Sequence, residues 1–260
     1  MASIYAKYGE YYDLIYSDKN YEIECSNIED YFNKYCKIKP KSILDVACGT
    51  GSHALIFAKK GYKVTGIDIS EVMIEQAKKK AEKMHLQVVF QVQDMRKIKL
   101  NRKFDAALCL FGSIGYMITD EDLLQALKNI RGHLVDDGIF VFDFWPTTSY
   151  VTRQRWYTPR KVVKDDITII RLMKGEFVIS KSLLKLEIEC YVIKGDRVID
   201  HFTENHLLRG FTITELSHYL VECGFKPLAF FKVKWGGERV YTFDEVDAGT
   251  SNACCIALAA

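Results

Sequence analysis

A glycine-rich loop is the first feature of the sequence that could bind a ligand. The segment ILDVACGTGSHA covers residues 43–54, and its Gly49 and Gly51 follow a short apolar run. The spacing fits the fingerprint G-x-G-x-x-G/A, in which glycines let the backbone approach a ligand and a following helix N-terminus favours its anionic groups. The glycines alone leave open whether the ligand is NAD or an adenosine cofactor without a pyrophosphate.

Asp45 lies inside the apolar run just before these glycines. A buried carboxylate is costly unless it has a partner. The anionic pyrophosphate of a dinucleotide does not require an acid here, whereas S-adenosyl-L-methionine carries a cationic amino group that does. The alternative is that Asp45 caps amides of the loop. His53, which follows the loop, is expected to touch the cofactor or the cap of the next helix.

Two further carboxylates end the next predicted strands. Asp68 closes the second strand in VTGIDIS, where it can accept hydrogen bonds from a ribose diol of either NAD or S-adenosylmethionine. Asp94 and Met95 close the third strand in VVFQVQDM. An aspartate and a backbone amide can bind an adenine edge, and Met95 and Ile69 can sandwich the ring. Together with Asp45, these positions favour the methyl donor.

Strands and helices alternate over residues 41–145, a pattern typical of a parallel sheet covered by helices. Ser70 is expected to cap one helix, and another is expected after Asp120. Strands are predicted at Ser42–Ala47, Lys63–Ile67, Val88–Gln93, Phe104–Leu110 and Ile139–Phe144.

The pattern changes between about residues 146 and 210. Apolar and polar residues alternate in ITIIRL, EFVIS, LLKLEIECYVI and RVIDHFTENHLL, with KGE and KGD as expected turns, which predicts an inserted antiparallel sheet. This insertion, residues 146–210, is expected to form a wall of the acceptor pocket or a dimer surface. Thr212 and Glu215 then predict a capping box for a helix closed by Gly224. Two final strands are expected at about Pro227–Lys234 and Ala253–Leu258.

The bulk composition narrows the classes of partner. Of the 260 residues, 36 are Lys or Arg and 34 are Asp or Glu, and the net charge of +2 argues against a protein whose main task is to grip nucleic acid. The chain has no apolar run long enough for a membrane span. The eight cysteines form no C-x-x-C pair, so they are interpreted as core residues of a protein in the reducing cytoplasm, with no metal site.

The segments ILDVACGTG, GIDIS, QDM and FDAALCLFGSIGYM together resemble the successive motifs of class I S-adenosylmethionine-dependent methyltransferases. The resemblance covers residues 40–145, with the family's closing helix and strand pair at about 212–258. It implies an α/β fold with a Rossmann-like, doubly wound seven-stranded sheet whose last strand is antiparallel. Residues 1–145 and 211–260 would form this domain. The implied cofactor contacts are Asp45, Ala47, Gly49 and Gly51 at the methionine moiety, Asp68 at the ribose, Asp94 and Met95 at the adenine, and Phe111 near the methyl group.

Four tyrosines near the start of the chain, Tyr5, Tyr8, Tyr12 and Tyr16, share one helical face. For most of them, packing against the sheet is the simpler interpretation. The segment YYDLIYS nevertheless resembles the N-terminal lid of small-molecule N-methyltransferases, including sugar-amine dimethyltransferases. The resemblance implies a helical lid over residues 1–38, in which Tyr12 reaches the donor and the acceptor.

FGSIGYM and FDFWP resemble the same sugar-amine group. Several of those relatives have His where this chain has Tyr116, and tyrosine, with an ordinary pKa of about 10, is a weaker base than histidine. Asp143 and Trp145 would face the acceptor, and Asp143 could hold an ammonium group or take its proton. Tyr12, Tyr116 and Asp143 are therefore the catalytic candidates.

His201 and His206 lie five residues apart in a predicted strand, so they point to opposite faces and at most one can enter the cleft. Because His206 shares a face with Phe202 and Leu208, it is interpreted as an ordinary half-buried histidine rather than a base.

These observations favour a cytoplasmic methyltransferase that transfers a methyl group to a small-molecule acceptor by in-line displacement, with nitrogen favoured over oxygen. The segment LFGSIGYM lacks the N-P-P-Y type of motif that binds an extruded base, so no nucleic-acid partner is expected. No membrane partner is expected, and the chain would be a monomer or a homodimer. The alternatives are an NAD-dependent oxidoreductase, which leaves Asp45 and Asp94 unexplained, and a catalytically silent S-adenosylmethionine binder.

Overall fold

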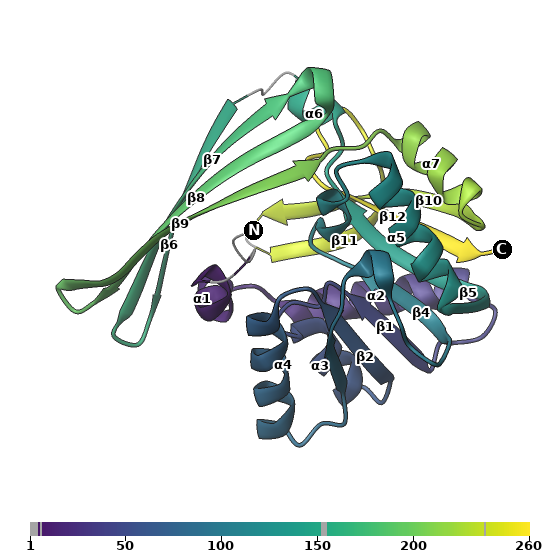
Figure 1. Ribbon diagram of the computed structural model, residues 1–260, viewed down its shortest axis with the longest axis horizontal. Coiled ribbons are helices and arrows are strands. Elements are labelled where there is room, and N and C mark those ends of the chain that lie inside the picture. Colours follow the sequence, from purple (N-terminus) through teal and green to yellow (C-terminus); the bar gives the residue numbers. More distant parts are fainter. Residues whose placement is uncertain (1–4, 6, 152–154, 237) are drawn as a thin grey trace.

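The structure is a computed structural model that describes residue 5 and residues 7–151, 155–236 and 238–260. The chain forms one sheet of eight strands and one of four. In Figure 1 the four-stranded sheet extends away from the larger sheet as long hairpins. None of the helices in the described ranges is long and apolar enough to cross a membrane.

The larger sheet is doubly wound. Its strands, in spatial order, are β11 (Glu238–Glu245), β10 (Phe225–Gly236), β12 (Ala253–Ala259), β5 (Leu134–Phe144), β4 (Phe104–Cys109), β1 (Ser42–Val46), β2 (Lys63–Asp68) and β3 (Val89–Val92). Strands β3, β2, β1, β4 and β5 pair in parallel, whereas β12 is antiparallel to both β5 and β10. The strand order reverses between β1 and β4, so the carboxyl ends of these two strands border a crevice suited to a ligand.

The predicted seven-stranded α/β sheet with an antiparallel last strand is confirmed, and β11 is added at its edge, antiparallel to β10. The sequence pattern does not indicate β11, because its two buried side chains include a charged one, Arg239, beside Tyr241. The segment ERVYTFDE therefore lacks the apolar alternation of a half-buried strand.

Side-chain caps mark the starts of α4 and α7, as the sequence predicts. Ser70 accepts a hydrogen bond from the Met73 amide, and Thr212 forms the predicted capping box with Glu215. The α-helices are α1 (Lys7–Ile15), α2 (Tyr21–Tyr35), α3 (Ser52–Lys59), α4 (Glu71–Lys83), α5 (Asp120–Gly132), α6 (Thr148–Val151) and α7 (Ile213–Glu222). Short 3₁₀ helices are η1 (Met95–Lys97), η2 (Ser113–Tyr116) and η3 (Ile179–Lys181).

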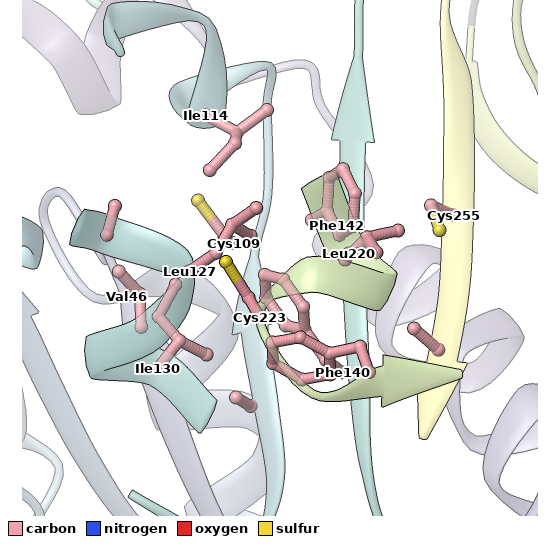
Figure 2. Close-up of a cluster of buried hydrophobic side chains, with 14 of the residues drawn as sticks. Val46, Cys109, Ile114, Leu127, Ile130, Phe140, Phe142, Leu220, Cys223 and Cys255 are labelled. Atoms are coloured by element: carbon pink, nitrogen blue, oxygen red, sulfur yellow. The ribbon is translucent and has the colours of Figure 1, made fainter. Parts of the chain in front are cut away.

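Both faces of the larger sheet are buried. On one face, Leu127 and Ile130 of α5 and Leu220 of α7 pack against Phe140 and Phe142 of β5 (Figure 2). The alternate residues of β5 point the other way. They join a second cluster that holds α2, α3 and α4 on the opposite face and includes Ile28, Ile43, Phe57, Ile74 and Val141. Burial on both sides fixes the strand ends that carry the predicted ligand contacts.

The smaller sheet confirms the inserted antiparallel element. Its strands, in order, are β6 (Arg155–Lys164), β7 (Ile167–Val178), β8 (Leu183–Lys194) and β9 (Arg197–Arg209). The predicted turn at KGD is confirmed, because Gly195 lies between β8 and β9 with a φ of +60°.

The predicted turn at KGE is wrong, since these residues lie inside β7. Gly175 leaves space there for the Trp156 ring of β6, because a Cβ at Gly175 would lie 2.1 Å from that ring. The glycine marks a close approach of a side chain to the backbone rather than a reversal of the chain. It also explains why the sequence pattern shows β7 as two short pieces.

Helix α1 lies between the two sheets (Figure 1), packed against α4 on one side and against β6, β7 and β9 on the other. Tyr8 and Tyr16 are buried, and both hydroxyls lie within hydrogen-bond distance of the Arg171 guanidinium of β7. The packing interpretation of the tyrosine stripe holds for these two residues.

Candidate functional site

The glycine loop joins the end of β1 to the start of α3. Ala47, Gly49 and Gly51 all have positive φ angles, of 55°, 55° and 77°. A Cβ at Gly51 would lie 2.6 Å from the Phe90 ring, so a glycine is required there by both conformation and space. This sharp turn directs the loop amides and the N-terminus of α3 toward the crevice.

A cavity of about 420 Å³ lies beside this loop, between the carboxyl ends of the strands and the segments that cover them. Most predicted site residues line it. These are Tyr12, Asp45, Ala47, Gly49, His53, Asp68, Ile69, Asp94, Met95, Phe111 and Tyr116. Gly51 and Asp143 are not among its lining residues, and Gly51 serves the cavity by shaping the loop.

Asp45 and Asp68 lie together at the centre of the cavity wall. The Asp68 carboxylate is held by the Gly49 and Ser70 amides, at 2.8 and 2.9 Å. Asp45 is 2% exposed, and its Oδ2 has no hydrogen-bond partner among the described residues. Burial, with a smaller contribution from the Asp68 charge, raises the pKa of Asp45 to about 7.

The unpartnered Asp45 oxygen is the observation that tests the implied cofactor. A cationic amino group would pair with it and remove the cost of burying the carboxylate. The donor set therefore fits the ammonium of S-adenosylmethionine, and the interpretation of Asp45 as only a cap of the loop does not account for its free oxygen.

The predicted adenine end differs from expectation in one respect. Ile69 and Met95 line the cavity as predicted, but the Asp94 carboxylate holds Arg96 through contacts of 2.5 to 3.0 Å. Arg96 also pairs with Asp122 of α5 at 2.9 Å. Burial raises the pKa of Asp94, but Arg96 outweighs it, and the pKa is lowered overall. Asp94 thus remains ionised with part of its hydrogen-bonding capacity already used.

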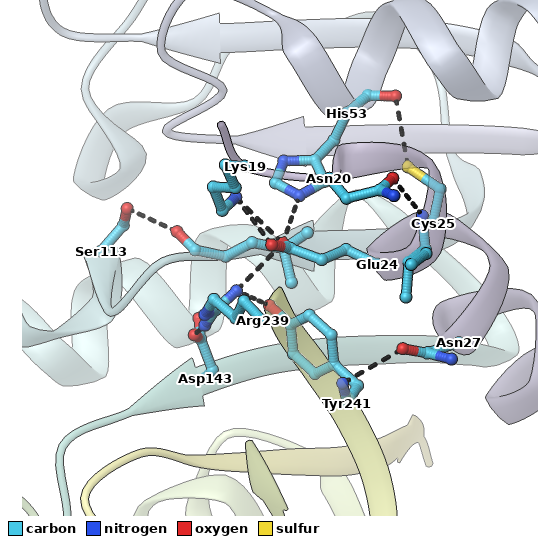
Figure 3. Close-up of polar contacts among 12 residues, drawn as sticks. Lys19, Asn20, Glu24, Cys25, Asn27, His53, Ser113, Asp143, Arg239 and Tyr241 are labelled. Atoms are coloured by element: carbon cyan, nitrogen blue, oxygen red, sulfur yellow. Dashed lines mark hydrogen bonds and ion pairs between the residues drawn. The ribbon is translucent and has the colours of Figure 1, made fainter. Parts of the chain in front are cut away.

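A buried charge cluster, consisting of Lys19, Glu24, His53, Asp143 and Arg239, lies at the other end (Figure 3). The Glu24 carboxylate contacts Lys19 at 2.9 Å, His53 Nε2 at 2.8 Å and Arg239 Nη1 at 3.1 Å. Lys19 and His53 also line the cavity. The cluster therefore supplies both a structural anchor and part of the cavity wall.

The pKa values in this cluster follow from burial and pairing. Burial alone would raise the pKa of Glu24, but His53 and Arg239 lower it to about 2. Burial lowers the pKa of His53 to about 4, so the imidazole is neutral near pH 7 and donates its Nε2–H to Glu24. Burial also lowers the pKa of Lys19 to about 7, although Glu24 opposes this shift.

The structure contradicts the predicted placement of Asp143 beside the acceptor. This side chain is 1% exposed, forms an ion pair with Arg239 and accepts a hydrogen bond from the Gly112 amide at 2.9 Å. Trp145 likewise stacks on Tyr150 instead of lining the cavity. The partner Arg239 comes from β11, about a hundred residues away along the chain, so no local pattern reveals the pairing.

Aromatic side chains form a further part of the cavity wall, here called its aromatic side. Tyr5, Tyr12, Phe111 and Tyr116 all line it. The Tyr116 hydroxyl lies 2.7 Å from the Tyr5 hydroxyl and 2.8 Å from His206 Nδ1. His206 therefore belongs to the cavity wall, and its interpretation as an ordinary core histidine is incomplete.

His201 is exposed and pairs with Glu189, as expected for a residue on the opposite face from His206. Sequence reasoning missed the roles of Lys19, Arg96 and His206. The signal available for His206 was its alternation with His201, which predicted that at most one of the two histidines enters the cleft and did not indicate a partner for it.

Comparisons with known proteins bear on the family and the fold. Residues 43–138 match the family model described as a methyltransferase domain. The chain is 30% identical to dTDP-3-amino-3,4,6-trideoxy-alpha-D-glucopyranose N,N-dimethyltransferase of Streptomyces venezuelae over 223 residues, which cover 84% of this chain and 90% of the relative. It is 29% identical to dTDP-3-amino-3,6-dideoxy-alpha-D-glucopyranose N,N-dimethyltransferase of Streptomyces fradiae over 78% of each chain.

Among solved structures, DesVI of Streptomyces venezuelae superposes with a TM-score of 0.82 at 25% identity, over 98% of this chain and 99% of that one. The two curated relatives are both named as N,N-dimethyltransferases, and the matches cover 90% and 78% of their lengths, so the alternative of an NAD-dependent oxidoreductase is not supported.

The state of Asp45 yields a prediction about ligand binding. The affinity for S-adenosylhomocysteine should rise as the pH rises through about 7, because the ionised carboxylate pairs with the ammonium of the ligand. Ligand at a hundredfold its dissociation constant stabilises a fold by about 2.7 kcal/mol. Asp45→Asn should lose most of this stabilisation and its pH dependence, measured as the thermal midpoint with and without ligand.

The same variant should affect the ligand-free protein in the opposite direction. Since the folded-state pKa of Asp45 lies above its ordinary value, the stability contributed by the protonated form is lost as the pH rises toward 7. Asp45→Asn removes that loss. At pH values above 7, the thermal midpoint of the ligand-free variant should therefore be higher than that of the wild type. The exposed Asp137→Asn is the control, and stabilisation by NAD in place of S-adenosylhomocysteine would contradict the assignment.

The position of Asp143 yields a prediction about stability. Asp143→Ala leaves the buried Arg239 without one of its carboxylate partners, and removing one member of a buried pair costs about 3–5 kcal/mol. Urea unfolding should show this loss, while S-adenosylhomocysteine still binds the folded variant. If the variant keeps its stability and loses only methyl transfer, that result would support the predicted role of Asp143 at the acceptor site.

Proposed function

The chain belongs to the S-adenosylmethionine-dependent methyltransferases, and from this premise we propose that its acceptor is the amino group of an amino sugar. The observation that carries the proposal is the match over most of both chains to a relative named for the dimethylation of a dTDP-linked amino sugar. The cofactor S-adenosylmethionine supplies a methyl group on a cationic sulfur, which an amine lone pair can attack directly.

The proposed cofactor contacts follow the line of the cavity. Asp45 would take the ammonium, the amides of the glycine loop the carboxylate, and Asp68 the ribose. Ile69 and Met95 would enclose the adenine. Phe111, whose φ is +68°, would lie beside the sulfonium at the turn after β4.

The proposed acceptor region is the aromatic side of the cavity. Tyr12 and Tyr116 would orient the sugar, and Asn205 and His206 of β9 would close the wall above it. Orientation can supply roughly 7–11 kcal/mol of the barrier when two reactants are held in attack geometry. A neutral amine needs little more than this, and nitrogen is therefore favoured over oxygen as the accepting atom.

Two segments would cover the reacting groups. The N-terminal lid, within residues 1–38, would close the cavity through α1, whose Asp13 contacts Thr50 and Lys80 at 2.5 and 2.7 Å. The insertion, residues 146–210, would supply the opposite wall through β9. Together these segments would exclude water from the transferring methyl group.

Mass spectrometry of a turnover assay tests the proposal. With S-adenosylmethionine and a dTDP-linked 3-amino-6-deoxyhexose, the protein should add one or two methyl groups to nitrogen and release S-adenosylhomocysteine. The matched acceptor carries a hydroxyl in place of the amine and should react at least about a hundredfold more slowly, because a hydroxyl needs a base to attack.

Two outcomes would contradict the proposal in different ways. Methylation of the hydroxyl acceptor at a comparable rate would indicate an O-methyltransferase. Binding of S-adenosylhomocysteine without turnover of a broad set of amines and alcohols would favour a catalytically silent binder.

A further inference from the structure

Three side chains from separate parts of the chain form a hydrogen-bonded row along the cavity wall. Tyr5 precedes α1, Tyr116 ends η2 and His206 lies in β9. The Tyr116 hydroxyl stands in the middle, 2.7 Å from the Tyr5 hydroxyl and 2.8 Å from His206 Nδ1. All three side chains line the cavity, so the row has access to a ligand.

The far nitrogen of the His206 ring faces a second unpartnered group. His206 Nε2 lies 3.6 Å from Glu204 Oε2, and neither atom has a hydrogen-bond partner among the described residues. The other Glu204 oxygen accepts the Tyr8 amide hydrogen at 3.0 Å, which fixes the carboxylate in this position. A proton on the imidazole would thus have a carboxylate oxygen 3.6 Å away.

Each hydrogen bond of the row can run in either direction, and the nearby Glu204 carboxylate favours an N–H on His206 Nε2. Burial lowers the pKa of His206 to about 4, so the ring is neutral near pH 7 and has one N–H and one acceptor nitrogen. With the N–H on Nε2 toward Glu204, Nδ1 accepts the Tyr116 hydrogen. Tyr116 then accepts the Tyr5 hydrogen and keeps a lone pair for the cavity.

We propose that His206, acting through Tyr116, takes the proton that an ammonium acceptor must lose before it can be methylated, with Glu204 as the counter-ion. This inference rests on the proposed function. The acceptor N–H proton passes to the Tyr116 oxygen while the Tyr116 proton passes to His206 Nδ1. The nitrogen keeps the electron pair of the broken N–H bond, Tyr116 stays neutral and His206 becomes an imidazolium.

The remaining bonds and charges balance. The freed lone pair forms the new N–C bond as the C–S bond of the donor breaks and its electron pair stays on sulfur. The product leaves as a methylammonium ion, and the imidazolium loses its proton to water, so one proton is released for each methyl group transferred.

The row also compensates for a weakness of tyrosine as a base. Burial raises the pKa of Tyr116 well above its ordinary value, so this side chain keeps its own proton and does not act as a tyrosinate base. The titratable groups that face His206 are Tyr5 and Tyr8 from the N-terminal segment, Tyr116 from η2 and Glu204 from its own strand. Of these, Glu204 is the one whose carboxylate would balance the charge of the imidazolium, and burial raises the pKa of this carboxylate.

The direction of the row can be tested without any acceptor. In protein labelled with ¹⁵N-histidine, the His206 signals are identified by their absence from the His206→Gln spectrum. Nδ1 should have the chemical shift of an unprotonated acceptor nitrogen near pH 7, and Tyr116→Phe should move it toward that of a free nitrogen. A proton found on Nδ1 overturns the proposal, since the nitrogen could not accept another.

Kinetics test the proton transfer itself. His206→Gln should lower kcat/KM for the amino sugar about a hundredfold below the pKa of the acceptor ammonium, a typical loss for a general base. The loss should shrink at higher pH, where the acceptor arrives as the free amine. A merely structural role predicts a loss that does not change with pH, and that result overturns the proposal.

Matched variants keep the kinetic test clear of folding effects. His201→Gln, on the exposed face of the same strand, should behave as wild type. Glu204→Gln, which keeps an acceptor for the Tyr8 amide, should show a smaller loss with the same recovery at high pH. Tyr116→His in the His206→Gln background puts an imidazole directly in the cavity and should restore activity at low pH.

If the wild type methylates no amino sugar, the proposed function fails, whereas the ¹⁵N spectrum still decides the direction of the row.

Discussion

The buried Glu24 carboxylate is the interaction on which the geometry of the cavity depends. It joins Lys19 and its own helix α2 to His53 at the start of α3 and to Arg239 of β11. Arg239 continues the connection to Asp143 at the end of β5, which in turn holds the Gly112 amide after β4. Five elements, α2, α3, β11, β5 and β4, are thereby fixed relative to one another by buried side chains.

The carboxylates of this cluster are paired with cationic side chains, whereas the carboxylate of Asp45 beside the glycine loop is not. In the cluster each carboxylate has a cationic partner, which offsets the desolvation cost of burial. Asp45 is equally buried, yet its Oδ2 has no partner among the described residues, and its pKa rises to about 7. The fold thus compensates the charges that hold it together and leaves uncompensated the one that faces the cavity, where a cationic ligand completes the pair.

Local sequence patterns predicted the features that depend on neighbouring residues. Apolar runs located the parallel strands, Ser70 and Thr212 marked helix starts, and the carboxylates at successive strand ends indicated the cavity. Features that depend on distant partners were not predictable in this way. Asp143 could be placed at a strand end, but its partner Arg239 lies on an edge strand that carries no apolar alternation.

Gly175 and His206 also show that a local sequence pattern does not predict contacts with distant residues. Gly175 has the composition of a turn, and only the Trp156 ring from the neighbouring strand explains why it lies inside β7. His206 has the setting of a core residue, and only Tyr116, 90 residues earlier, gives its nitrogen a partner in the cavity. In both cases the decisive contact joins two different elements. The alternation of side chains along one strand, with a period of two residues, contains no information about such a contact.

The four-tyrosine stripe shows how one pattern can serve packing and ligand binding together. Tyr8 and Tyr16 turn toward Arg171 and fix α1 on the smaller sheet, whereas Tyr5 and Tyr12 line the cavity. Tyr8 and Tyr12 lie on α1, and Tyr5 and Tyr16 flank its two ends, so a movement of α1 away from the smaller sheet would also move the tyrosines that line the cavity. The packing of α1 on the smaller sheet and the enclosure of this side of the cavity therefore depend on the same segment, and helix propensity alone determines neither.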